Sequence, residues 1–261
     1  MINLEKKTIV ITGAAGNVGR SITNSLAKLG ANLIIIDKYK RDLDKVCSNL
    51  NLNPSQKILS LACNFEIEKQ RSNVIKKIKA KFNSLDCLIN NAAYTGVMKV
   101  SGWNEPFNKQ SLDTWRRAFE VNLTSVFHLC RDLNSLLSKS NRGSIINIAS
   151  IYGEYGPDYS LYKNTNMANP AAYASSKGGL IQFSRWLATT LAPKIRVNVI
   201  SPGGIERGQS KKFIKKYINK TPLNKMAKEN DISNSVIYLV SDLSSHVTGQ
   251  VLRVDGGWGV W

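Results

Sequence analysis

Short continuous runs of apolar residues alternate with longer stretches of helical apolar spacing along most of the chain. The continuous runs predict buried strands and cover residues 8–12, 32–36, 57–63, 85–89, 145–148 and 195–200. The helically spaced stretches cover residues 21–29, 41–52, 66–82, 111–138, 170–191 and 231–241. Strand and helix patterns that alternate in this order predict an α/β fold, a doubly wound and mainly parallel sheet with helices on both faces.

The turn between the first strand and the first helix has the sequence T-G-A-A-G-N-V-G, residues 12–19. Gly13 permits a tight turn, and Gly19 permits close packing of the helix on the strand. The start of the helix offers unpaired N–H groups and the positive end of a dipole to a pyrophosphate. This pattern predicts a dinucleotide site, with a purely structural turn as the alternative.

Asp37 ends the second strand, 18 residues after Gly19. A carboxylate at this point can accept hydrogen bonds from the adenosine ribose hydroxyls and would repel a 2′-phosphate, so we expect NAD. Lys38, Lys40 and Arg41 follow and would partly neutralise the carboxylate, which leaves NADP open. A solvated acidic turn residue is the alternative for Asp37.

Tyr173 and Lys177 are four residues apart and therefore share one face of the predicted helix. A neighbouring cation favours the phenolate, and lowering the pKa of a tyrosine from about 10 to about 7 takes about 4 kcal/mol. Ser150 follows a buried strand, so its hydroxyl is expected at the carboxyl end of the sheet, where open α/β sheets bind ligands. These residues predict acid–base chemistry.

Together, Ser150, the Tyr173-x-x-x-Lys177 pair and the glycine turn resemble the short-chain dehydrogenase/reductase family, and the resemblance extends from about Lys7 to Trp258. It implies one Rossmann-like domain over residues 1–261 with seven strands, the last within 248–257, and a substrate-covering segment over about 204–228. It also implies an NAD(P)-dependent oxidoreductase that acts on CH–OH groups, and a homo-oligomer, either a dimer or a tetramer. On the predicted helix over residues 111–138, Trp115, Phe119, Val126 and Phe127 are expected to face a core or a partner subunit.

The resemblance also implies a role for each catalytic position. Tyr173 would exchange the substrate proton and Ser150 would polarise the substrate oxygen. Lys177 would lower the Tyr173 pKa and hold the nicotinamide ribose, while Asn122 would hold a water on the proton path. The implied cofactor contacts are Gly13, Asn17, Val18, Gly19, Asp37, Asn64, Asn91, Ala92, Tyr173, Lys177, Pro202, Gly203 and Ile205.

Several positions depart from the family pattern. Asn17 and Ala93 stand where glycines are usual, and Asn64 stands where an aspartate is usual. Asparagine tolerates left-handed backbone, so the turn at Asn17 can persist, although its side chain adds bulk. Arg207 stands where a threonine is frequent and places a cation near the substrate mouth.

The segment between Ser150 and Tyr173 is about ten residues longer than is usual in the family, and its extra part, Gly153 to Asn169, contains Tyr155, Tyr159 and Tyr162, of which Tyr155 and Tyr159 are the expected substrate contacts. Aromatic faces and hydroxyls suit sugar-like substrates, with a packed loop as the alternative. Members of the family that make nonulosonic-acid-type sugars for surface glycans have similar segments, which implies an anionic amino sugar, sugar phosphate or nucleotide sugar. A reductase of a 3-oxoacyl thioester and a non-catalytic NAD-binding sensor stay as alternatives.

The formal charge is +18, from 36 basic and 18 acidic residues, which would suit a polyanion. The lysines are scattered over predicted helix faces, so we expect no nucleic acid partner. There is no apolar run of 18 residues and no signal-peptide pattern, so we expect a soluble, cytoplasmic protein without a membrane partner. The four cysteines form no C-x-x-C pair and only two histidines accompany them, so we expect packing thiols and no metal.

Overall fold

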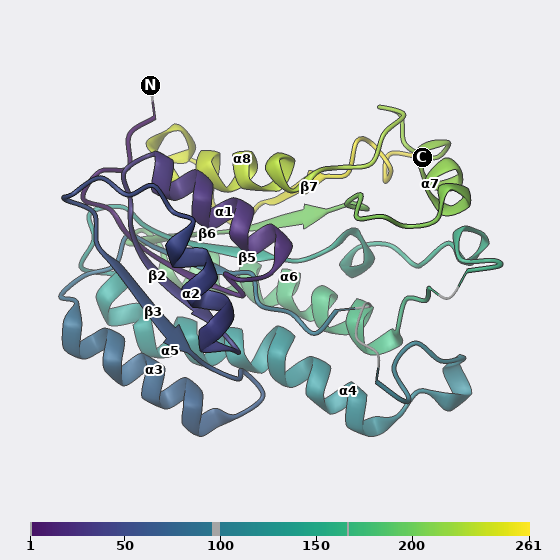
Figure 1. Cartoon of the computed structure of the whole chain (residues 1–261), viewed down its shortest axis with the longest axis horizontal. Coiled ribbons are helices and arrows are strands. Elements are labelled where there is room, and N and C mark those ends of the chain that lie inside the picture. Colours follow the sequence, from purple (N-terminus) through teal and green to yellow (C-terminus); the bar gives the residue numbers. More distant parts are fainter. Residues whose placement is uncertain (1, 96–99, 166) are drawn as a thin grey trace.

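The computed structural model describes residues 2–95, 100–165 and 167–261. Its centre is a seven-stranded sheet in the order β3-β2-β1-β4-β5-β6-β7, and all neighbouring strands are parallel (Figure 1). The strands are β1 (Thr8–Thr12), β2 (Asn32–Asp37), β3 (Ile58–Ala62), β4 (Cys87–Asn90), β5 (Gly143–Ile148), β6 (Ile195–Pro202) and β7 (Val251–Val254). The predicted doubly wound parallel sheet is confirmed.

The strand order reverses between β1 and β4. The chain first runs outward from β1 to β2 and β3, then returns to β4 on the other side of β1, and Ile9 lies opposite Cys87 where the two meet. Ligands of open α/β sheets bind at the carboxyl ends of the strands on either side of such a reversal. This topology fixes the place of the candidate site.

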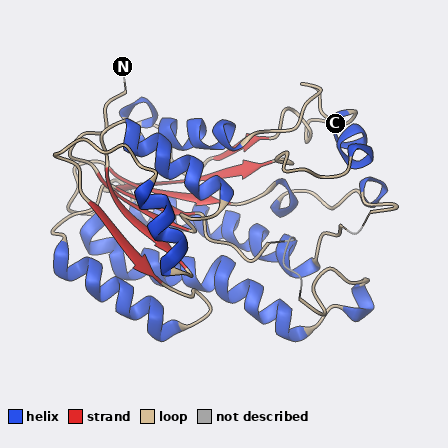
Figure 2. Ribbon diagram, viewed as in Figure 1, coloured by secondary structure: helices blue, strands red, loops and turns tan. Residues whose placement is uncertain are grey.

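Helices cover both faces of the sheet (Figure 2). One face carries α1 (Asn17–Lys28), α2 (Lys40–Ser48) and α8 (Glu229–Val240), and the other carries α3 (Glu68–Lys81), α4 (Leu112–Phe119), α5 (Ser125–Leu137) and α6 (Ala171–Leu191). Each helical layer packs on one face of the sheet and forms a separate apolar core there. Because both faces of the strands are buried, the strand sequences are continuous apolar runs.

The helix predicted over residues 111–138 is continuous but not uniform. Ser111 caps it, because its Oγ accepts a hydrogen bond from the Thr114 N–H at 3.1 Å. Between α4 and α5, residues Glu120–Thr124 form a π-helical turn. Such single turns inside a helix often occur at functional sites.

A third, smaller core lies over the carboxyl ends of the strands, beside α7 (Lys211–Ile218). Its buried members are Ile151, Leu161, Phe213, Tyr217, Met226 and Trp258. The segment after β5 forms two short 3₁₀ turns, of which Ile151–Gly153 contacts α6 and β6 and Tyr159–Leu161 contacts α7. This small core forms the wall of the candidate site.

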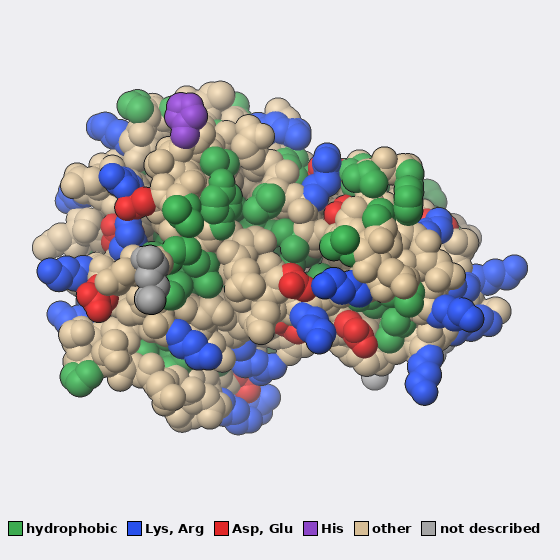
Figure 3. Space-filling view, turned by 90° about the horizontal axis from the view of Figure 1, so that it is seen from above, with side chains coloured by type: hydrophobic (Ala, Val, Ile, Leu, Met, Phe, Trp, Pro, Cys, Tyr) green, Lys and Arg blue, Asp and Glu red, His purple; other side chains and the backbone are tan. Residues whose placement is uncertain are grey.

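Lysine and arginine side chains are spread over the face seen in Figure 3 and do not gather in one patch there. In the described part of the chain, no helix combines the length and apolarity needed to cross a membrane. Cys63, Cys87 and Cys130 are buried and Cys47 is half-buried, and all four are free thiols.

Candidate active site

The glycine turn after β1 has no room for side chains at two positions. Gly13 has a φ of +65°, and a Cβ there would lie 2.8 Å from Ala92 Cα. A Cβ on Gly19 would lie 1.9 Å from the Gly13 carbonyl oxygen, so α1 packs directly on the turn. Asn91 Nδ2 donates to the Gly13 carbonyl oxygen at 3.0 Å and ties the turn to the end of β4. The turn therefore has the close approach that the sequence predicted for both glycines.

Asn17 is the first residue of α1, so its backbone is helical and the left-handed tolerance considered from the sequence is not needed. Its Oδ1 accepts a hydrogen bond from Arg20 Nη2 at 2.6 Å on the exposed side of the helix. Gly16 stands at the N-cap, and no side chain caps the first turn of α1. The N–H groups of that turn stay available to a phosphate.

Asp37 is held at the end of β2 beside this turn. Its carboxylate accepts hydrogen bonds from the Ala15 N–H at 2.8 Å and the Lys38 N–H at 2.6 Å. The Lys38 ammonium and the Arg41 guanidinium lie 5.5 and 5.4 Å from the centre of the Tyr39 ring. Because these two cations stack on Tyr39, neither forms an ion pair with Asp37.

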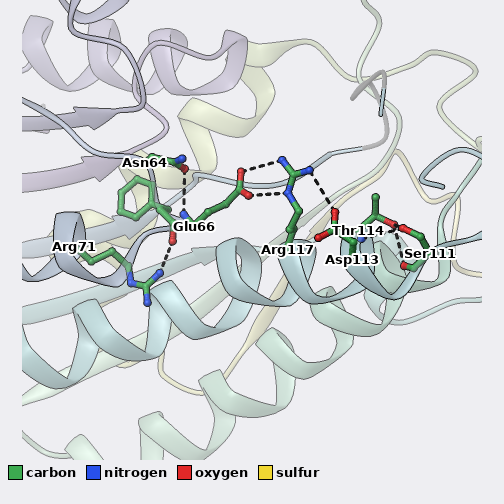
Figure 4. Close-up of polar contacts among 8 residues, drawn as sticks. Asn64, Glu66, Arg71, Ser111, Asp113, Thr114 and Arg117 are labelled. Atoms are coloured by element: carbon green, nitrogen blue, oxygen red, sulfur yellow. Dashed lines mark hydrogen bonds and ion pairs between the residues drawn. The ribbon is translucent and has the colours of Figure 1, made fainter. Parts of the chain in front are cut away.

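Two arginines hold the loop that follows β3, which contains Asn64 (Figure 4). Arg117 Nε donates to Glu66 Oε2 at 2.7 Å, and Asn64 Oδ1 accepts from the Glu66 N–H at 3.1 Å. Arg71 donates to the Phe65 carbonyl oxygen from the other side. This loop is therefore fixed at one end of the candidate site, and the side-chain oxygen of Asn64 already accepts one hydrogen bond from within the loop.

Asn90 and Asn122 connect the strands to the helices beneath them. Asn90 Nδ2 donates to Asn147 Oδ1 at 2.8 Å and so ties β4 to β5. Asn122, in the π-helical turn, accepts from the Tyr94 N–H at 2.7 Å and donates to Ser176 Oγ at 2.9 Å. The mid-helix asparagine is thus explained, because its side chain joins the loop after β4 to α6.

Ser150, Tyr173 and Lys177 meet at the carboxyl end of β5. Lys177 is buried at 2% exposure, and its Nζ donates to the Ile148 carbonyl oxygen at 2.6 Å. The same Nζ lies 5.9 Å from the centre of the Tyr173 ring. The Ser150 hydroxyl lies close enough to the Tyr173 phenol to lower its pKa through side-chain hydrogen bonding, and both residues line the same cavities. The structure therefore brings together the serine, tyrosine and lysine that the sequence singled out.

The electrostatics of these three residues differ from the expectation. Burial raises the pKa of the Tyr173 phenol, and the Ser150 hydrogen bond and the Arg207 charge only partly oppose that effect. Burial also lowers the pKa of Lys177 to about 7. The expected lowering of the Tyr173 pKa by Lys177 is therefore not seen in this structure, because desolvation is the largest effect on both groups.

A cleft of about 970 Å³ runs along the carboxyl ends of the strands from Asp37 to Arg207. It is lined by every residue for which the sequence analysis expected a cofactor contact: Gly13, Asn17, Val18, Gly19, Asp37, Asn64, Asn91, Ala92, Tyr173, Lys177, Pro202, Gly203 and Ile205. Ser150 lines it too, whereas Asn122 lies behind its wall.

A second cavity of about 460 Å³ adjoins the cleft and shares Ser150 and Tyr173 with it. We call it the side chamber, and its lining includes Ser150, Tyr152, Tyr162, Tyr173, Phe213 and Met226. The cleft and the side chamber meet at the two hydroxyl groups best placed for acid–base chemistry.

The tyrosines expected to meet substrate do not line the side chamber. The Tyr155 ring packs 6.2 Å from the Trp258 ring and 5.6 Å from the Arg253 guanidinium, and Tyr159 is 64% exposed. Tyr152 and Tyr162 take the expected place. Tyr152 lies two residues after Ser150, a proximity that was available in the sequence, whereas Tyr162 is brought in only by the fold of the segment.

Arg207 lines the cleft near Tyr173, but it has a partner. Its Nε donates to Glu229 Oε1, at the start of α8, at 2.9 Å. The expected cation at the substrate mouth is therefore present and is partly neutralised by this carboxylate.

A parallel doubly wound sheet, a tight glycine turn and a serine–tyrosine–lysine set at the strand ends define a dinucleotide-dependent oxidoreductase. The family model described as enoyl-(acyl carrier protein) reductase matches residues 13–259. The chain is 32% identical to the 3-oxoacyl-(acyl-carrier-protein) reductase FabG of Thermotoga maritima, over 98% of this chain and 99% of that protein. It therefore belongs to the short-chain dehydrogenase/reductase family, as the motifs predicted.

Two further similarities bear on its activity. The chain is 27% identical to the post-translational flagellin modification protein A of Campylobacter coli, over 98% of this chain and all of that protein. The crystal structure of a short-chain dehydrogenase from Leptospira borgpetersenii with bound NAD+ is similar with a TM-score of 0.83 and 31% identity, over 98% of this chain and 94% of that one.

Proposed function

We propose that this protein is an NAD-dependent oxidoreductase that interconverts a secondary alcohol and a ketone on an anionic, sugar-like substrate. The observation that carries the proposal is the position of Ser150 and Tyr173, which line both the long cleft and the side chamber. A dinucleotide in the cleft and a substrate in the chamber would meet at these two hydroxyls.

The cleft fits a dinucleotide. Gly13 and Gly19 line it, and their lack of side chains lets α1 pack directly on the turn, so the uncapped N–H groups at the start of α1 lie where a phosphate chain would bind. The carboxylate of Asp37 is free of the Lys38 and Arg41 cations, which favours NAD over NADP, and NAD+ is bound in the similar Leptospira structure. When bound, the nicotinamide ring supplies hydride acceptance and donation.

The residues of the chain supply the proton chemistry. In oxidation Tyr173 takes the hydroxyl proton of the substrate, and in reduction it returns that proton to the carbonyl oxygen. The raised pKa keeps Tyr173 protonated at neutral pH, which suits the reductive direction. Lys177, with a pKa of about 7, is suited to exchange protons near neutrality, while Ser150 orients the substrate oxygen and Asn122 supports the path behind Lys177.

An anionic sugar fits the two cavities together. Arg207 lines the cleft close enough to act electrostatically on Tyr173, so an acidic group of the substrate would lie there. Residues 204–228 would cover the chamber, since α7 and Met226 form part of its wall. The similarity to the Campylobacter coli flagellin modification protein supports a sugar destined for a surface glycan.

Reduction of a 3-oxoacyl thioester is the second candidate, and the names of relatives such as the Thermotoga maritima enzyme favour it. For this reaction the side chamber would have to bind an acyl chain in place of a sugar ring. A non-catalytic NAD sensor is disfavoured, because Ser150, Tyr173 and Lys177 are all present and contact one cleft.

Localisation and assembly belong to the same proposal. We propose a cytoplasmic homotetramer built from dimers that pair through α5 and α6, where Phe127 is 45% and Trp186 is 58% exposed. Phe183 lies between them, with its ring centre 6.0 Å from Phe127 and 6.3 Å from Trp186. A continuous aromatic surface of this kind is typical of a protein interface.

The test of the proposed function is Tyr173→Phe, assayed by NADH absorbance with sugar phosphates, nucleotide sugars and an acetoacetyl thioester. Turnover should fall below a tenth of wild type, whereas the NADH dissociation constant should stay nearly unchanged because only the proton donor is lost. Tyr238→Phe, an exposed tyrosine on α8, is the matched control. Retained activity in Tyr173→Phe would refute the acid–base role.

A further inference from the structure

The wall of the side chamber is built as a fixed unit from two distant segments. The Tyr162 and Phe213 rings pack 5.9 Å apart, and Leu161 is fully buried beneath them. Lys216 Nζ donates to the Ser160 carbonyl oxygen at 2.7 Å, and Lys220 forms an ion pair with Asp158. The segment after β5 is thus attached to α7, so the shape of the chamber is set by contacts within the protein before a ligand binds.

No charged side chain lines the side chamber in the described ranges 2–95, 100–165 and 167–261. Its apolar lining includes Ile151, Pro170, Phe213 and Met226. An ionised phosphate or carboxylate placed there would lose its hydration without gaining a cationic partner. The acidic group of an anionic substrate therefore has to stay in the cleft, and the part inside the chamber is uncharged.

Two phenol groups of this lining, Tyr152 and Tyr162, are paired with each other. The Tyr152 and Tyr162 hydroxyl oxygens are 2.5 Å apart, and burial raises the pKa of both groups, so both remain protonated. Both also interact electrostatically with Tyr173, which places them near the reacting centre. Two hydroxyls bring two hydrogens and their mutual bond uses one, so one donor and several lone pairs remain for a ligand.

A second donor belongs to the same wall. Asn169 lines the chamber at 5% exposure, and no described residue accepts a hydrogen bond from its amide nitrogen. A buried donor without a partner costs about 1 to 3 kcal/mol, which an acceptor oxygen on the ligand would offset. The hydrocarbon part of an acyl chain, beyond the carbonyl groups of the thioester end, offers no such oxygen to Asn169 or to the tyrosine pair.

We propose that the Tyr152–Tyr162 pair is the specificity-determining element of the side chamber and selects an uncharged, hydroxyl-bearing ring over an acyl chain. This inference rests on the proposed oxidoreductase function. The ring is read by hydrogen bonds to the paired hydroxyls and by contact with the aromatic faces of the wall.

The experiment measures kcat/KM of Tyr152→Phe and Tyr162→Phe with NAD and two kinds of probe. The sugar probes are glucose 6-phosphate, N-acetylglucosamine 6-phosphate and UDP-N-acetylglucosamine, and the acyl probe is 3-hydroxybutyryl-N-acetylcysteamine. Each variant should lower kcat/KM for the best sugar probe by about tenfold, as the loss of one hydrogen bond predicts, and should leave the thioester value within about twofold. Tyr159→Phe, an exposed tyrosine of the same segment, should change neither value.

The outcomes separate this inference from the function on which it rests. If the ratio of kcat/KM for the sugar probe to kcat/KM for the thioester stays constant in the variants, the inference is overturned. An equal fall of both values would then mean that the pair is only structural. A wild-type protein that turns over the thioester and no sugar probe also overturns it, but leaves the oxidoreductase function standing. A protein that binds NADH and turns over no probe of either kind overturns both.

Discussion

Lys177→Met should make the protein more stable at neutral pH, although it removes a residue of the candidate active site. Burial lowers the pKa of Lys177 to about 7 from 10.5, the ordinary value that it regains in the unfolded chain. Between these values the unfolded chain binds a proton that the folded chain does not, so the lysine destabilises the fold and stability rises with pH. The methionine removes this effect.

The magnitude follows from the two pKa values. At pH 7 the lysine costs about 4 kcal/mol of stability, and at pH 9 it costs about 2 kcal/mol. Against this gain, the variant loses the hydrogen bond from Nζ to the Ile148 carbonyl oxygen, which is worth about 2 kcal/mol. Lys177→Met should therefore be about 2 kcal/mol more stable than wild type at pH 7 and about equal to it at pH 9.

Urea unfolding followed by tryptophan fluorescence at pH 7 and pH 9 measures this difference. Burial raises the pKa of Cys63, Cys87 and Cys130 to about 12, so these thiols lower the stability of both proteins at alkaline pH and cancel in the comparison. Lys77→Met, an exposed lysine on α3, should show no such pH dependence. A stability difference that stays constant from pH 7 to pH 9 would refute the depressed pKa of Lys177.

Two further predictions concern cofactor and substrate. Asp37→Ser should raise the ratio of kcat/KM with NADPH to that with NADH by about tenfold, because the carboxylate that repels a 2′-phosphate is gone; an unchanged ratio in absorbance assays would show that Asp37 does not face the ribose. Arg207→Met should raise KM for the anionic sugar about tenfold. It should also move the rising limb of the oxidation pH profile to higher pH, because the cation that lowers the pKa of the Tyr173 base is lost, whereas Arg207→Lys should keep the pH profile. A variant with unaltered KM and pH profile would make Arg207 a surface residue.

The strands and the cofactor cleft were predictable because local patterns determine them. The five-residue run over residues 8–12 forms a largely buried strand, as its continuous apolar pattern predicts. The spacing of Gly13 and Gly19 predicts the tight turn that the structure shows. Asp37 could be placed because it follows a strand whose end was clear. Features that depend on only a few neighbouring residues can therefore be predicted from the sequence.

The side chamber could not be predicted in the same way. Tyr155, Tyr159 and Tyr162 lie in a segment without helical or strand periodicity, so nothing local shows which ring points inward. Tyr162 is positioned by residues about fifty positions later in the chain. Its ring packs on Phe213, and Lys216 donates a hydrogen bond to the carbonyl oxygen of the next residue, Lys163. The pKa values of Tyr173 and Lys177 escaped prediction for a related reason, since spacing gives the neighbour of a group but not its desolvation.

Asn122 shows how a remote contact can set the geometry of the site. Its π-helical turn begins at Glu120, whose carboxylate pairs at 2.6 Å with the guanidinium of Arg71, a residue of α3 that is 2% exposed. Arg71 Nε also donates to His128 Nδ1 at 3.3 Å, which leaves His128 Nε2 to face Asp132 at 3.2 Å. A buried guanidinium is stable only when its partners stay in place. The ion pair between Arg71 and Glu120 therefore fixes the junction of α4 and α5 against α3. The turn that aims the Asn122 amide at Tyr94 and Ser176 is therefore anchored from a helix that never reaches the cleft.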